Sequence, residues 1–220
     1  MTKLNKIILL ITLSFFNLLQ STLADESTVT YHVTFVNQWN ATDHLSFPTN
    51  AHFSPIVAVS HSSNYELFSL GKLATTGFES FAEVGTTRPL LREIRQAEMD
   101  GNVSDIQVTE PLFPRTDGDV IEFFVTVDKR NPLLSFATMI APSPDWIVGI
   151  NGLNTYANGH FIEKARFDLF AINAGTEEGD YPGNFSIDNR ATSPQQVISS
   201  LSSIPGLNLP FAQVMIERIK

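Results

Sequence analysis

Short runs of alternating apolar and polar residues, separated by turn-forming residues, dominate this chain. Thr28 to Val36 (TVTYHVTFV) is the clearest example, because bulky apolar side chains recur at every second position. Aspartate, asparagine, glycine and proline interrupt the chain between such runs, as they do between strands. The pattern predicts strands at 28–36, 54–60, 119–127, 133–140, 146–150, 161–170 and 211–219. Many strands at short spacing indicate an all-β fold, an antiparallel β-sandwich.

One segment has the periodicity of a helix instead. Between Arg88 and Met99 apolar residues recur at helical spacing, and charged or polar residues fill the other face. Thr87 stands where a residue could cap this helix, with Pro89 in its first turn. Asp100-Gly101-Asn102 would end it. We therefore expect a small helical insertion whose polar face consists of Arg92, Glu93, Arg95, Gln96 and Glu98.

Residues 1–24 have the composition of an export signal. Two lysines precede a mostly apolar run, and Thr22-Leu23-Ala24 offers small residues for cleavage. The apolar run is about 13 residues long, which is short of the roughly 20 needed to cross a bilayer. We expect the mature chain to be a single domain, 25–220, with no transmembrane segment after signal cleavage.

The charge balance and the absence of cysteine exclude several classes of function. The 220 residues include 23 Asp and Glu against 14 Lys and Arg, a net charge of −9. Nucleic-acid binding requires a basic footprint, so nucleic acid is excluded as a partner. With no cysteine, the chain has no disulfides, thiolate zinc sites, iron–sulfur clusters or cysteine nucleophiles.

Three oxygen-bearing side chains stand in two loops that neighbouring strands could bring together. Asp145 lies in Ala141-Pro-Ser-Pro-Asp-Trp146, whereas Asn173 and Glu177 bound Asn-Ala-Gly-Thr-Glu. Carboxylate and carboxamide oxygens with no sulfur or imidazole nearby suit a hard cation, above all Ca²⁺. The alternative is turn chemistry, because Asp after Pro and Asn before Ala-Gly both cap turns through side-chain-to-backbone hydrogen bonds. The residues by themselves leave both interpretations open.

Several motifs in chain order resemble a known family. They are HLSFPTNAHFSP at 44–55, SHSSNY at 60–65, PSPDW at 142–146 with Val148-Gly149 after it, and NAGTE at 173–177. Together they resemble the spondin N-terminal domain family, the F-spondin and mindin type of extracellular module, from about Tyr31 to Gly183. The resemblance implies an eight-stranded antiparallel β-sandwich similar to C2 domains. It also implies a short helical segment and a calcium ion at one end of the sandwich.

The resemblance places the ligands of that calcium ion by position. They are Asp145, Asn173 and Glu177, and the last two each stand where the family usually has aspartate. Asparagine keeps a coordinating oxygen but removes a charge, so we expect weaker affinity. Glutamate keeps the charge one methylene further out, which the loose coordination geometry of calcium tolerates.

What the resemblance implies for function is a secreted, calcium-binding and non-catalytic domain. It would act in adhesion or in recognition of extracellular matrix or cell surfaces, with an extracellular protein or glycan as partner. We expect it outside the cell, or in the periplasm if the host is a Gram-negative bacterium. Calcium-mediated membrane association is the least favoured variant, because no Lys/Arg cluster accompanies the proposed ion loops.

A secreted hydrolase of an extracellular polymer, built on the same sandwich, is the alternative function. It requires His44, His52 or His61 to meet a carboxylate in a pocket. The sequence contains no nucleophile elbow, phosphate-binding loop or zinc-helix motif, so no catalytic residue is assigned. We expect these histidines instead to bond loop backbone and to pack on an aromatic neighbour: Phe47, Phe53 or Tyr65.

Overall fold

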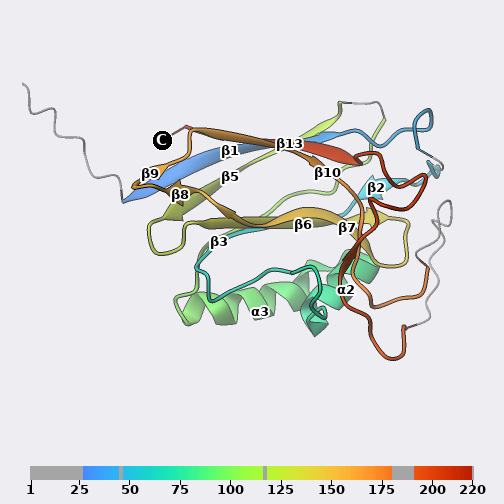
Figure 1. Cartoon of the computed structure of the whole chain (residues 1–220), viewed down its shortest axis with the longest axis horizontal. Helices are drawn as coiled ribbons and strands as arrows, with labels where there is room; N and C mark the ends of the chain where they lie inside the picture. The colour runs from blue at the N-terminus through green and yellow to red at the C-terminus, as the bar shows by residue number, and fades with distance from the viewer. Residues whose placement is uncertain (1–26, 45–46, 116–117, 180–190, 220) are drawn as a thin grey trace, which may run out of the picture.

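Two antiparallel sheets packed face to face, with two helices against the outer face of one of them, form the molecule (Figure 1). The computed structural model describes residues 27–44, 47–115, 118–179 and 191–219. The export signal expected at 1–24 lies outside these residues. Within them, no helix is long and apolar enough to cross a bilayer. The expected class, all-β with a small helical insertion, is confirmed.

The first sheet has β1 near its centre. In β1 every second side chain from Val29 to Phe35 points into the core and is buried, as the alternation in the sequence predicts. All neighbours pair antiparallel. The order across the sheet is β10 (Lys164–Leu169), β13 (Ala212–Arg218), β1 (Thr28–Asn37) and β5 (Val120–Asp128).

The second sheet also contains four strands of at least five residues within the described ranges: β7 (Trp146–Asn154), β6 (Leu133–Ala141), β3 (Val57–His61) and β4 (Val103–Val108). The eight-stranded sandwich is therefore confirmed in its long strands. Two-residue strands extend this sheet: β11 (Ile172–Asn173) and β12 (Ser199–Ser200) beyond β7, and β2 (His52–Phe53) against β6. A separate small hairpin joins β8 (Tyr156–Ala157) and β9 (His160–Phe161).

The second sheet is buried on both of its faces. One face contributes Phe136 and Trp146 to the core between the sheets. The other face contributes Val59 and Ile147 to a second core under the helices. This double burial explains why β6 reads as a nearly continuous apolar run instead of an alternating one, since all its residues except the first are buried.

The helices are α2 (Thr76–Val84) and α3 (Thr87–Met99). Helix α3 matches the expected helix, but its N-cap is Thr86, and no side-chain hydrogen bond caps it. The expected cap at Thr87 was therefore wrong. Helix α2 and strand β4 were not expected, because α2 has only nine residues and β4 is buried mainly at Val103 instead of on alternate positions.

Glu93 connects the two helices. Its Oε1 accepts the N–H of Gly77 at 2.6 Å, and its Oε2 accepts the hydroxyl of Thr75 at 2.5 Å. These bonds satisfy donors at the N-terminus of α2, where a negative charge also complements the helix dipole. The sequence placed Glu93 on a solvent face, whereas the structure uses it to hold α2 in place.

We expect Glu93→Ala to lower the free energy of unfolding by about 2 kcal/mol, because it leaves the N-terminal donors of α2 without this acceptor. Urea unfolding followed by circular dichroism measures the change. Glu98→Ala is the matched control, since Glu98 is exposed on the same helix, and it should change stability by less than about 0.5 kcal/mol. Equal effects of the two substitutions would contradict the role of Glu93.

Candidate metal centre

The two loops singled out in the sequence meet at one end of the second sheet. Asp145 immediately precedes β7, and Asn173 in β11 pairs with Trp146, the first residue of β7. The N–H of Ala174 donates to the carbonyl of Asp145 at 3.2 Å. The structure therefore brings the PSPDW and NAGTE loops together, as the sequence predicted.

The carboxylate of Asp145 is the centre of this junction. Asp145 is 0% exposed. Its Oδ2 accepts the N–H of Thr176 at 2.7 Å, the N–H of Glu177 at 3.2 Å and the hydroxyl of Thr176 at 3.3 Å. Its Oδ1 is also buried, yet it has no hydrogen-bond partner. A buried carboxylate oxygen without a partner is costly, so this oxygen is the feature that a bound cation would explain.

A tight turn in the NAGTE loop presents these N–H groups. Gly175 has φ 77°, and a Cβ atom there would lie 2.3 Å from the carbonyl oxygen of Gln196, so only glycine fits. Asn173, 8% exposed, accepts the N–H of Gly175 on its Oδ1 at 2.5 Å. The turn chemistry considered for Asn173 is thus present. An amide oxygen has a second lone pair, so this bond does not exclude coordination.

Glu177 is the third expected ligand and lies in the same turn. It is 9% exposed, and its backbone forms an isolated bridge with Ala191. The turn therefore carries a carboxylate of its own on a residue whose backbone N–H bonds Asp145.

Glu83 is a further carboxylate at this site that the sequence did not indicate. It lies in the last turn of α2, with its side chain near Thr176 and Asp145. Burial raises the pKa of Glu83, the nearby side chain of Thr176 lowers it, and the charges of Glu79 and Asp145 raise it further. In the sequence, Glu83 is simply a glutamate that follows Phe81 and Ala82. Nothing marks it as a site residue until the position of α2 against the sheet is known.

The electrostatics of the centre favour a positive ion. Burial raises the pKa of Asp145, although the N–H and hydroxyl groups of the 175–177 turn lower it. The candidate ligands supply only oxygen atoms, which suits a hard cation and not zinc. Among the described residues, no three His, Cys, Asp or Glu side chains are grouped closely enough to hold a metal ion. A complete shell here would also need the amide oxygen of Asn173, backbone carbonyls and water.

The three histidines named for the hydrolase alternative, His44, His52 and His61, each contact different neighbours. His44 packs edge-on against Phe211, and His52 stacks on Phe113. His61 contacts Tyr65, as expected, while its Nδ1 lies 2.8 Å from the carbonyl of Ser62. Its Nε2 lies 2.7 Å from Oγ of Ser135. His61 and Ser135 are 1% and 0% exposed, so this pair serves packing and not a substrate.

Comparison with known proteins identifies the family. The sequence profile described as Spondin_N matches residues 29–211. This chain belongs to the Spondin_N family. Spondin-2 of Homo sapiens is 30% identical over 177 residues, which cover 79% of this chain and 52% of that protein. Spondin-1 of Bos taurus is 34% identical over 213 residues, which cover 87% of this chain and 25% of that protein. The chain thus spans about half of Spondin-2 and a quarter of Spondin-1. The Spondin_N match includes Glu83, Asp145, Asn173 and Glu177.

Because burial raises the pKa of Asp145 above its ordinary value of 3.8, ionisation of this group works against folding when no cation is bound. The protonated carboxyl of Asp145 therefore favours the folded state at pH values below 3.8, and this contribution to stability is lost as the pH rises through the raised pKa. In EDTA, the stability of Asp145→Asn should therefore increase relative to the natural chain from pH 4 to pH 7. Urea unfolding of both proteins from pH 4 to pH 7 measures the difference between their free energies of unfolding. A difference that does not change with pH would contradict a raised pKa of Asp145.

Proposed function

We propose that this Spondin_N domain binds a calcium ion at the junction of the PSPDW and NAGTE loops. Asp145, Asn173 and Glu177 would supply ligands, and Glu83 would approach from α2. The observation that carries the proposal is the buried, partnerless Oδ1 of Asp145 beside a second carboxylate. A divalent cation would supply the positive charge that lowers the cost of burying these groups.

The ion would act on loop structure and not on chemistry. It would join three segments that are far apart in sequence: the end of α2, the β6–β7 loop and the loop after β11. Binding to the folded chain alone stabilises it by mass action. A fixed loop end on a rigid sandwich is a suitable recognition surface.

We infer that the domain acts outside the cell, in adhesion or in recognition of matrix or surface molecules, without catalysis. The signal-like composition of residues 1–24 and the membership in Spondin_N support this inference. An extracellular protein or glycan would be the partner. The separate engagement of the three histidines gives no support to the hydrolase alternative.

Calcium at about 100 times its Kd should stabilise the natural chain by about 2.7 kcal/mol. Asp145→Asn should abolish this gain, because the amide removes the charged oxygen. Calorimetric titration and thermal melting, each in calcium and in EDTA, measure uptake and stabilisation. An equal melting shift in both proteins, or no uptake by the natural chain, would refute the ion site.

Glu83→Gln tests whether α2 contributes a ligand. It should weaken calcium binding by about tenfold, since ligand charge tunes calcium affinity. Glu79→Gln removes the same charge one turn earlier on α2 and should change affinity by no more than about twofold. Equal weakening by both variants would show that Glu83 acts only through long-range charge.

Asn173→Asp should strengthen calcium binding by about tenfold, because it adds a charge while keeping the oxygen in place. In EDTA the same change should destabilise the chain, since it buries another carboxylate beside Asp145. The combination of tighter binding and lower apo stability is specific to a cation ligand. An unchanged calcium affinity would show that Asn173 only stabilises the turn and is not a calcium ligand.

A further inference from the structure

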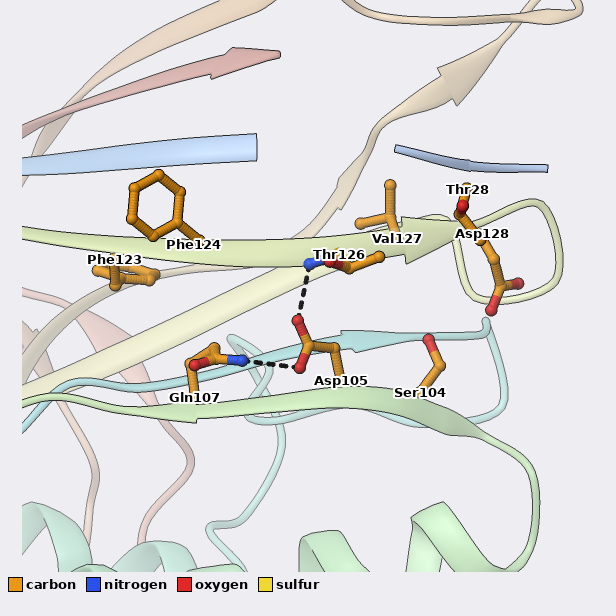
Figure 2. Close-up of a pocket in the computed structure, with 9 residues that line it drawn as sticks. All are labelled: Thr28, Ser104, Asp105, Gln107, Phe123, Phe124, Thr126, Val127 and Asp128. Carbon is orange, nitrogen blue, oxygen red and sulfur yellow. Dashed lines mark hydrogen bonds between the residues drawn. The ribbon is translucent and has the colours of Figure 1, made fainter. Parts of the chain in front are cut away.

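A groove separates the free edges of the two sheets. Strand β5 is the last strand of the first sheet and β4 is the last strand of the second, so each has an edge without a neighbouring strand in the ladder. Between them lies a cavity of about 520 Å³ (Figure 2), a size typical of ligand pockets. Its lining comprises Thr28, Ser104, Asp105, Gln107, Phe123, Phe124, Thr126, Val127 and Asp128.

The groove and the metal centre lie at different ends of the sandwich. Thr28 begins β1 and Asp128 ends β5, next to the turn that leads into β6 at Leu133. Asp145 lies just beyond the other end of β6. Figure 1 shows the β5–β6 turn and helix α2 at opposite ends of the molecule. A ligand in the groove would therefore not contact the ion.

Asp105 spans the groove and is held rigidly in it. Its Oδ2 accepts the backbone N–H of Thr126 across the gap at 2.7 Å, and its Oδ1 accepts Nε2 of Gln107 at 2.8 Å (Figure 2). An edge strand exposes N–H groups that attract other strands. Here a side chain takes one of them, and in doing so it fixes a carboxylate in an open groove.

The lining has the chemistry of a guanidinium site. Its ionisable side chains are Asp105 and Asp128, and the latter is held by the N–H groups of Arg130 and Asn131 at 2.6 and 2.9 Å. The positive charge of Arg130 lies near Asp128 and partly neutralises it. Asp105 is therefore the carboxylate more available to a cationic ligand. Phe124 also lines the groove; it is 52% exposed, and one face of its ring stacks on His32 of β1. Arginine binds carboxylates through paired N–H groups and also packs its flat face on aromatic rings.

The shape of the groove favours a ligand with an extended backbone. It runs along two strand edges, and β5 continues for six residues before Thr126. An extended peptide can pair with such an edge. We propose that this groove binds an extended segment of a partner protein, with an arginine of that segment on Asp105. The inference rests on the proposed role in recognition but does not require the ion.

The test uses a fluorescein-labelled peptide, acetyl-Thr-Val-Thr-Val-Arg-Val-Thr-amide, and its twin with citrulline in place of arginine. Citrulline has almost the same shape without the charge. Fluorescence anisotropy with the full chain should show the arginine peptide binding at least about tenfold more tightly than the citrulline peptide. Equal binding of the two peptides, or no binding of the arginine peptide, overturns the proposal.

Gln107→Lys places an ammonium group beside Asp105 and should weaken binding of the arginine peptide by about tenfold or more. Glu98→Gln changes the net charge by the same amount on α3 and should alter binding by less than about twofold. Thermal melting of both variants checks that they are folded. Unchanged binding in a folded Gln107→Lys chain overturns the proposal, and so does binding of a glucosamine oligomer in place of the peptide.

The two proposals fail separately. Peptide binding in EDTA should equal that in calcium, because the groove and the ion site lie at opposite ends of β6. Loss of peptide binding with normal calcium uptake would overturn only the groove. Absent calcium uptake with normal peptide binding would overturn only the ion site.

Discussion

Burial of the second sheet on both faces is the constraint on which the rest of this structure depends. One face closes the core against the first sheet, and the other carries α2 and α3. The helices are therefore not an appendage to a sandwich but a third layer, without which residues such as Val59 and Ile147 would be exposed. Glu93 bonds the N-terminus of α2, and α2 in turn carries Glu83 to the end of the sheet.

At that end, a single carboxylate joins two loops, the PSPDW loop and the turn after β11. Asp145 satisfies the turn after β11 through one oxygen and keeps the other buried without a partner. A neutral polar residue could cap the same turn at lower cost, because burying a charge is expensive. The presence of an acidic residue at full burial, with Glu83 near it, is the physical basis for proposing a cation here.

Much of the fold could be predicted from local patterns. The alternation in Thr28–Asn37 and the amphipathic spacing in Thr87–Met99 reflect one-sided burial, which period and residue type reveal directly. Helix α2 is short, and β4 lies at an edge with mixed exposure, so neither shows a clear period. Glu93 appeared as one more charge on a polar helix face, because its acceptor role depends on where α2 packs.

The sequence alone determined the family and the sandwich class, and it indicated that the Asp145 loop could meet the Asn173–Glu177 loop. Those features follow from motifs and from short-range periodicity, which each segment carries by itself. Only the tertiary structure decided that Glu83 lies near Asp145, that Asp145 Oδ1 has no hydrogen-bond partner, and that Asp105 reaches Thr126 across the open edge. These depend on which elements pack together over long separations in the chain, and no local pattern encodes the distance between two sheet edges.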